Sequence, residues 1–139
     1  MALKIVRLMH AGLRIGPSEE DLQKAEAFYG DLMGLPNDES RPHIPEIPGF
    51  WSKLPGRDAD QQIHIFGAEG ASPVARSPKQ DPTRAHIALA VEDIDEARAE
   101  LKRQGIEFWV YESLVGDASD QVFFEDPFGN MIELQQQPK

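Results

Sequence analysis

The sequence contains no cysteine among its 139 residues. This absence excludes disulfide bonds, thiolate metal ligands and a cysteine nucleophile. It also agrees with a reducing compartment, and we expect a cytoplasmic protein. Any metal ion must therefore be held by histidine, carboxylate or amide side chains.

Basic clusters and long apolar runs are missing as well. The chain has 14 Lys and Arg residues against 24 Asp and Glu, which gives a net charge of -10. Because phosphate-backbone binding needs clustered cations, no nucleic-acid partner is expected. No apolar run approaches the roughly 20 residues that cross a bilayer, and residues 1–6 lack the features of a signal peptide, so no membrane partner is expected either.

What remains is the composition of an ordinary globular protein. Hydrophobic residues make up 40% and charged residues 27% of the chain. A chain of this length supports one compact domain, or two small modules that share a sheet. We expect a single domain over residues 1–139.

The first half predicts a strand, a helix and further strands. Residues 4–15 are β-rich, and apolar residues at helical spacing follow from Ser18 or Asp21 to about Met33, with Gly34 as the stop. A loop is predicted over 36–48, which contains four prolines. Two hairpin strands are predicted over 50–54 and 61–66, joined near 55–58.

The second half repeats this order. It predicts a strand over 85–91, a helix from about 92 to 104 that Gly105 ends, and strands over 121–124 and 130–135. The two halves align, which indicates an internal repeat. The predicted fold class is α+β: two βαβββ modules form a curved mixed sheet with the helices on its outer face. Module one spans about 4–67, a linker about 68–83, and module two about 84–136.

Four residues occupy equivalent positions in this repeat. His10 and His86 lie on the first strand of each half, and His64 and Glu133 lie on the last. Strand alternation places them on the sheet face opposite their apolar neighbours. Three imidazoles and one carboxylate suit one divalent metal ion such as Zn, Ni, Fe, Mn or Co. Taken singly, each histidine has the alternative of a hydrogen-bonded structural role.

Aromatic residues near these strands are candidates for the wall of a small-molecule pocket. The alternative is that they belong to the core. The predicted substrate-binding aromatics are Phe50, Trp51, Phe66 and Phe124.

The order of motifs resembles the vicinal oxygen chelate superfamily, which includes glyoxalase I, the bleomycin resistance proteins and the extradiol dioxygenases. Residues 8–14 and 85–91 are similar to the first-strand signatures of glyoxalase I, residues 125–134 to its last-strand signature, and residues 25–35 to its first helix. The resemblance covers nearly the whole chain. It implies the glyoxalase/dioxygenase fold.

The resemblance also implies roles for particular residues. It places His10, His64, His86 and Glu133 on the family's metal positions, and Glu133 on the catalytic carboxylate that moves the substrate proton. His64 stands where glyoxalase I and its epimerase relatives usually have Glu or Gln. Arg14 matches an arginine that binds the glutathione carboxylate, with an exposed ion pair as its alternative role.

The function implied is a glyoxalase-like, metal-dependent isomerase or lyase for a small α-hydroxycarbonyl or thiol-adduct substrate. One alternative is an extradiol-type dioxygenase, because His10, His86 and Glu133 would make a two-histidine, one-carboxylate triad for iron. Another is an antibiotic-binding protein without chemistry. A homodimer is expected from the resemblance, and the two modules could pair within one chain or exchange between two.

Overall fold

The computed structural model describes residues 2–44, 46–56, 60–112, 114 and 120–138. The chain divides into two compact units. The N-terminal unit contains residues 10–85, and the C-terminal unit contains residues 1–9 together with 86–139. Strand β1 (Ile5–Ile15) contributes to both units, because the boundary falls between Met9 and His10.

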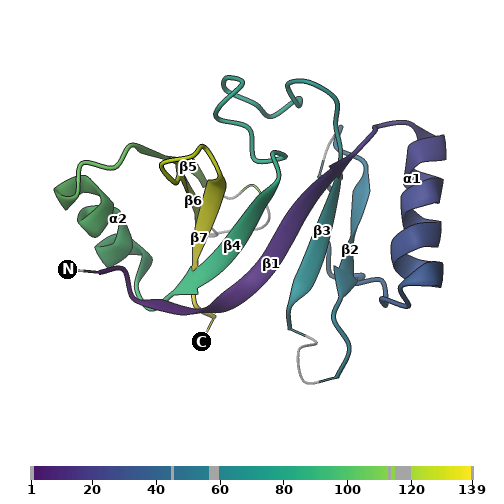
Figure 1. Ribbon diagram of the computed structural model, residues 1–139, viewed down its shortest axis with the longest axis horizontal. Helices are drawn as coiled ribbons and strands as arrows, with labels where there is room; N and C mark the ends of the chain where they lie inside the picture. Colours follow the sequence, from purple (N-terminus) through teal and green to yellow (C-terminus); the bar gives the residue numbers. More distant parts are fainter. Residues whose placement is uncertain (1, 45, 57–59, 113, 115–119, 139) are drawn as a thin grey trace. The chain divides into compact units, whose positions relative to one another are not determined.

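The C-terminal unit contains a complete strand, helix and three-strand sequence. Strand β7 lies between β4, to which it is parallel, and β6, to which it is antiparallel, and β5 pairs antiparallel with β6 (Figure 1). The elements are β4 (His86–Val91), α2 (Ile94–Arg103), β5 (Phe108–Glu112), β6 (Asp120–Glu125) and β7 (Met131–Gln136).

Helix α2 begins and ends as its sequence predicts. The carboxylate of Asp93 accepts hydrogen bonds from the backbone N–H groups of Asp95 and Glu96, which satisfies two donors of the first turn. After the helix, Gly105 adopts a φ of 71°, the left-handed conformation that favours glycine.

Side chains of the C-terminal unit cover both faces of its strands. One face packs against α2 with the buried residues Val91, Ala97, Leu101, Val122 and Leu134. The other face carries a separate cluster of Trp109, Tyr111, Phe123 and Met131. Because strand residues alternate between faces, Glu133 lies on the second face, away from α2.

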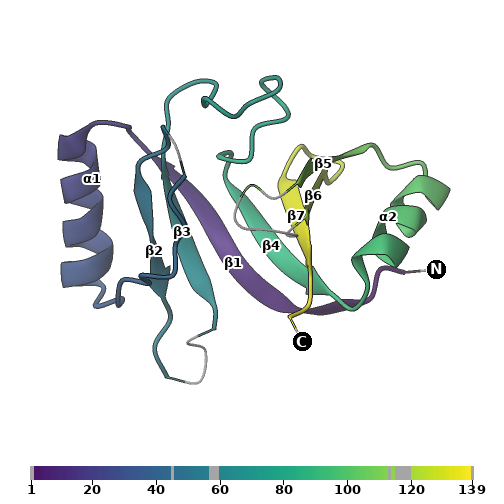
Figure 2. The same ribbon diagram turned by 180° about the vertical axis from the view of Figure 1, so that it is seen from behind.

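The N-terminal unit has the same arrangement with one strand fewer. Strand β3 (Gln62–Gly67) lies between β1, to which it is parallel, and β2 (Gly49–Lys53), to which it is antiparallel. In place of a further strand there is a single β-bridge between Asn37 and Ser52. Helix α1 (Glu19–Glu26) lies beside β2 (Figure 2). Its Ala25 packs against Phe50 and Ile65.

The first helix differs from its prediction in its second half. The Ser18 side chain caps α1 by accepting from the Asp21 N–H, as expected. From Ala27 to Leu32 the chain forms the wider helical segment η1, in which the Met33 N–H donates to the Phe28 carbonyl five residues earlier. Gly34 ends the helix with a φ of 70°.

The predicted fold class is confirmed, since the strands form a mixed sheet and each helix packs on one face of the strands in its unit. The strands predicted from the sequence did not include β5. In the first module, the described residues form a β-bridge where a third strand was expected. Residues 57 and 58 of the predicted turn at 55–58 lie outside the described residues. Among the described helices, none is long and apolar enough to cross a membrane.

The segment predicted as a linker is held by a buried carboxylate. The side chain of Asp81 is fully buried and accepts hydrogen bonds from the backbone N–H and the hydroxyl of both Ser72 and Thr83. Arg14 Nη2 lies 3.2 Å from Asp81 Oδ2. Burial by itself would raise the pKa of Asp81, but the hydrogen bonds from Ser72 and Thr83 outweigh it and hold the pKa below that of an ordinary aspartate.

Replacing Asp81 with Asn should lower the free energy of unfolding at neutral pH by about 2 kcal/mol, because charge-assisted hydrogen bonds are lost in a buried position. The folded-state pKa is depressed, so this stabilisation is present at neutral pH and is lost as the pH falls through that pKa. Urea unfolding at several pH values should therefore show a difference from wild type that shrinks in acid. Glu69→Gln, at an exposed position of the same segment, is the control and should have little effect. A stability difference between wild type and Asp81→Asn that does not depend on pH would contradict a stabilising role of the ionised Asp81 carboxylate.

Candidate functional site

Glu133 is a buried carboxylate in the middle of β7. It is 1% exposed and lies directly across from Phe123 of β6. Its Oε1 is 2.9 Å from Nε2 of His86 on β4. A carboxylate in such a place needs charged or hydrogen-bonding partners, because an uncompensated buried charge is strongly destabilising.

Two amide groups supply part of this compensation. The Gln121 amide donates to Glu133 Oε2 over 3.1 Å, and the Gln135 amide donates to the same oxygen. One carboxylate oxygen therefore faces two N–H donors while the other faces the imidazole of His86. These contacts fix the orientation of the carboxylate.

His64 of β3 is fixed in a different way, by aromatic stacking. Its ring is stacked on the indole of Trp51, with centroids 4.0 Å apart, and on the imidazole of His10, with centroids 3.7 Å apart. Strand pairing places Trp51 opposite His64, so the first stack follows from the register. The Nε2 atom of His64 is 2.7 Å from Oε1 of Gln62.

Each unit thus brings together two of the four predicted metal ligands. His10 lies against His64 in the N-terminal unit, and His86 lies against Glu133 in the C-terminal unit. All four residues are buried.

The predicted aromatic wall is divided between the two faces of the strands. Trp51 and Phe66 lie on the face of His64, with Phe66 edge-on to the imidazole at 6.2 Å. Phe50 lies on the opposite face, in the cluster with Ala25 and Ile65. There it lines a cavity of about 400 Å³ between η1 and β2, away from the histidine.

Phe124 likewise lies on the helix face of its unit, packed against the cluster that includes Val122 and Leu134. On β6 the aromatic side chain that lies on the Glu133 face is Phe123, the neighbour of Phe124, and its ring is 5.9 Å from that of His86. The β6–β7 register decides this, because it pairs Phe123 with Glu133 and Phe124 with Ile132.

Arg14 makes an ion pair, but with the buried carboxylate of Asp81 rather than at an exposed position. Besides Asp81, its guanidinium donates to the Thr83 hydroxyl and to the Gly70 carbonyl. The side chain is 29% exposed. Three acceptors from the segment 68–83 therefore engage the group that was predicted to bind a substrate carboxylate.

The residues that the sequence reasoning missed are polar neighbours of the predicted ligands: Asp38, Gln62, Gln121 and Gln135. A signal was available for two of them, because Gln62 and Gln135 stand two residues from His64 and Glu133 and so share their strand face. Gln121 depends on the strand register, and Asp38 lies in a loop.

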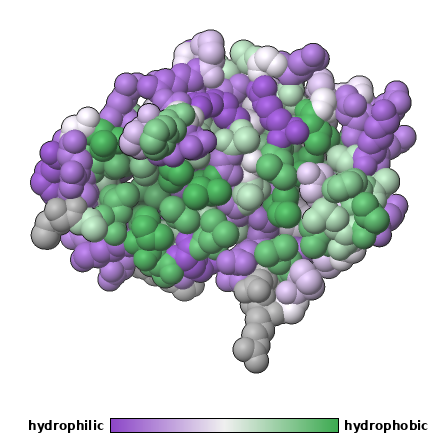
Figure 3. All heavy atoms as spheres, viewed as in Figure 1, coloured by the Kyte–Doolittle hydropathy of each residue, from purple (hydrophilic) through white to green (hydrophobic). Residues whose placement is uncertain are grey.

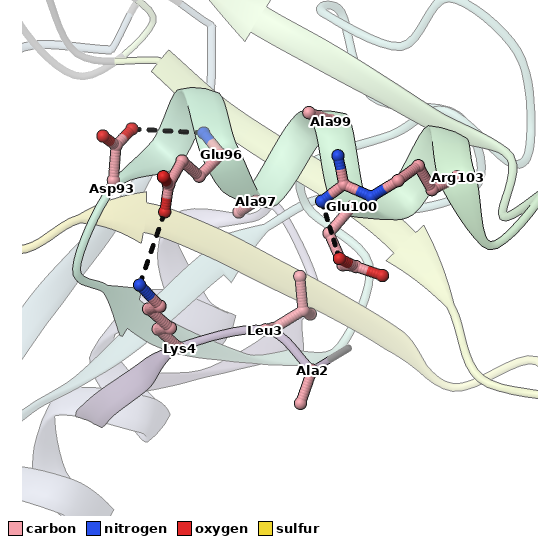
Figure 4. A pocket seen from close by; sticks show the side chains of 9 residues that line it. All are labelled: Ala2, Leu3, Lys4, Asp93, Glu96, Ala97, Ala99, Glu100 and Arg103. Carbon is pink, nitrogen blue, oxygen red and sulfur yellow. Dashed lines mark hydrogen bonds and ion pairs between the residues drawn. The ribbon is translucent and has the colours of Figure 1, made fainter.

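A second cavity, of about 200 Å³, lies between α2 and the first residues of the chain (Figure 4). It is bordered by two ion pairs, Lys4 with Glu96 and Arg103 with Glu100. None of its lining residues is a predicted site residue.

Comparisons with known proteins agree with this fold. The mitochondrial methylmalonyl-CoA epimerase of Bos taurus is 28% identical over 137 residues, which cover 94% of this chain and 74% of that protein. The crystal structure of methylmalonyl-CoA epimerase from Mycobacterium tuberculosis is similar with a TM-score of 0.71 and 21% identity, covering 100% of this chain and 93% of that one. A Streptomyces coelicolor methylmalonyl-CoA epimerase in complex with 2-nitronate-propionyl-CoA gives a TM-score of 0.66 at 17% identity, covering 99% of this chain and all of that one.

The family profile described as Glyoxalase/Bleomycin resistance protein/Dioxygenase superfamily matches residues 14–134, which is most of the chain. The predicted resemblance is confirmed, and the chain belongs to this superfamily.

Proposed function

We propose that this protein is a metal-dependent enzyme that moves a proton next to a carbonyl group of a small substrate, with Glu133 as the base. The observation that carries the proposal is the buried Glu133 carboxylate, fixed 2.9 Å from His86 by two amide donors. A general base must be held within reach of the proton that it removes. Burial of an ionised carboxylate destabilises a fold, so its presence here favours a functional reason.

The proposed metal ligands are His10, His64, His86 and Glu133, and the ion is one divalent cation such as Zn, Ni, Fe, Mn or Co. Among the described residues, the buried group that could hold such an ion consists of His10, His86 and Glu133, and it does not include His64. When bound, a divalent cation polarises a substrate carbonyl and so acidifies the adjacent C–H group.

Glu133 would remove the proton from the carbon beside the carbonyl, and the electron pair of the broken C–H bond would move toward the carbonyl oxygen. The protonated carboxyl group would then return the proton to a neighbouring carbon. Gln121 and Gln135 keep the carboxylate in one orientation during both steps. Because Glu133 is the one carboxylate among the four proposed ligands, we favour transfer between adjacent carbons on one face of the substrate.

Two substrate classes fit this chemistry. The first is an α-hydroxycarbonyl compound or its thiol adduct, which the glyoxalase-like motifs favour. The second is an acyl-CoA thioester, which the methylmalonyl-CoA epimerases among the relatives favour. Both classes carry an acidic proton beside a carbonyl. We place the first class ahead, because inversion at one carbon is served best by two opposed bases.

Replacing Glu133 with Gln should lower turnover of the substrate at least about 100-fold, because a positioned general base contributes that much or more. Metal affinity should fall much less, since one oxygen donor remains. Exchange of the substrate C–H proton with D₂O, followed by NMR in metal-saturated protein, measures the step directly. His64→Ala should instead weaken metal binding and leave the base in place.

The control for this variant is Glu112→Gln, which removes a carboxylate at an exposed position of β5. Its exchange rate should equal that of wild type. Full activity of metal-saturated Glu133→Gln would show that Glu133 is not the base.

A dioxygenase is the second candidate, because His10, His86 and Glu133 have the composition of a two-histidine, one-carboxylate iron site. Metal analysis of protein purified without added metal should distinguish the two. Nickel or zinc, with no oxygen uptake in the presence of catechols, is expected for proton transfer. Bound ferrous iron with catechol ring cleavage would replace the first proposal by the second.

We also propose a homodimer as the assembly state. Apolar side chains gather on the part of the C-terminal unit seen in Figure 3, and Ile5 and Ile87 are exposed large hydrophobics of this unit. Light scattering at micromolar concentration should give the mass of a dimer, and Ile5→Lys with Ile87→Lys should give a monomer. Ile106→Lys, at a similarly exposed position, is the control. A monomeric wild-type protein would contradict this prediction.

A further inference from the structure

The cavity of about 400 Å³ between η1 and β2 belongs to none of the roles assigned above. The described residues that line it all lie within the N-terminal unit. It borders the helix face of β2, opposite the face on which Trp51 stacks on His64. Pockets that bind small molecules begin at about 300 Å³, so this cavity has the size of a binding site.

A buried hydroxyl group lines the inner part of the cavity. Ser52 is 1% exposed and, because side chains alternate along a strand, lies on the same face of β2 as Phe50. Within the described part of the chain, no donor or acceptor pairs with its hydroxyl. Buried polar groups are normally hydrogen-bonded, because an unpaired one destabilises the fold. The Ser52 hydroxyl is therefore available to a group inside the cavity.

Two carboxylates stand at the mouth of the cavity. Glu26 and Asp31 line it at exposed positions, and neither forms an ion pair with a described residue. The exposed amide of Asn37 adds a further polar group, and none of the described lining residues is basic. Charges of one sign around a cleft raise the local concentration of ions of the opposite sign, so the cavity favours a cation.

The helix beside the cavity leaves this space open. Turns of the π-helical kind found in η1 are frequent at functional sites. Gly30 of η1 lines the cavity, and a Cβ atom added to it would meet no atom within 4 Å. The missing side chain of Gly30 therefore keeps part of the cavity empty.

An organic cation fits this cavity better than a metal ion. A divalent metal needs several oxygen ligands that converge on one point at about 2.0–2.6 Å. The group of described residues that could hold a metal ion contains neither Glu26 nor Asp31. The volume and the wall formed by Phe50 and Leu35 suit a carbon skeleton instead. An ammonium group is attracted to aromatic faces as well as to carboxylates.

We propose that this cavity binds a small organic cation, an amine whose ammonium group faces Glu26 and Asp31 at the mouth. Its carbon skeleton packs on Phe50, and a second polar group, such as a hydroxyl, reaches the buried Ser52. Amino alcohols and phenolic amines have this chemistry. The site lies on the helix face of the strands, so it does not depend on the proposed enzyme activity.

Amide NMR of the ¹⁵N-labelled protein during a titration with tyramine tests the proposal. The signals of Gly30, Asn37 and Ser52 should shift and reach saturation. Tyrosol has the same skeleton with a hydroxyl in place of the ammonium group. Each ion pair at an exposed position contributes up to about 5-fold in affinity, so tyrosol should bind about 5-fold to 25-fold more weakly than tyramine.

The double variant Glu26→Gln with Asp31→Asn should lower the affinity for tyramine by a similar factor and leave that for tyrosol unchanged. Glu19→Gln with Glu39→Gln is the matched control, because it removes two exposed carboxylates that do not line the cavity. This control should bind tyramine as the wild type does. An equal loss of affinity in both double variants would show attraction by the net charge alone and would overturn the site.

Two further variants test the interior of the cavity. Gly30→Leu should abolish binding, because the new side chain fills the space, while leucine favours a helix more than glycine does. Ser52→Ala should weaken tyramine about 5-fold, the effect of one hydrogen bond, and should not change the affinity for phenethylamine, which lacks the hydroxyl. Its melting temperature should equal or exceed that of wild type, because an unpaired buried hydroxyl is removed.

Three results would each overturn the proposal. The first is a wild-type protein whose Gly30, Asn37 and Ser52 signals do not respond to tyramine. The second is equal affinity for tyramine and tyrosol, and the third is unchanged binding in Gly30→Leu. If Gly30→Leu does not fold, the comparison of tyramine with phenethylamine in Ser52→Ala decides, and an equal change for both ligands would place the amine elsewhere.

Discussion

The burial of one carboxylate constrains the strands of the C-terminal unit. Glu133 sits at the centre of β7 with 1% of its surface exposed, between a parallel and an antiparallel neighbour. An isolated ionised carboxylate in such a place would destabilise the fold by several kcal/mol. The strands therefore have to deliver partners, which they do as the imidazole of His86 and the amides of Gln121 and Gln135.

The N-terminal unit holds its buried polar side chain with different groups. Its central strand carries His64, which contacts two stacked rings and the side chain of Gln62. Gln62 in turn donates to the carboxylate of Asp38. In both units the key side chain lies on the strand face opposite the helix, and glutamine side chains contact it. The repeat thus preserves an architecture while exchanging an acid for an imidazole at the equivalent position.

Much of the fold could be read from periodicity and end signals. Ser18, Gly34 and Gly105 mark helix ends in the sequence, and each acts as predicted. The sequence also predicted the strand face on which His64 and Glu133 lie, because the alternation of side chains along a strand is a local property. The strand faces of the aromatic residues were predicted less well. Phe50 and Phe124 were expected beside the site and lie on the helix side, since their faces depend on how neighbouring strands pair.

The sequence by itself determined the class of fold, the repeat and the four candidate ligands, since each rests on residue type and spacing along one strand. Only the tertiary structure decided that Phe123 faces Glu133, that Arg14 is engaged by Asp81, and that Asp38 reaches His64 through Gln62. These contacts join residues from different strands and loops. Their geometry is set by strand register and loop path, which the spacing of residues along one segment does not encode.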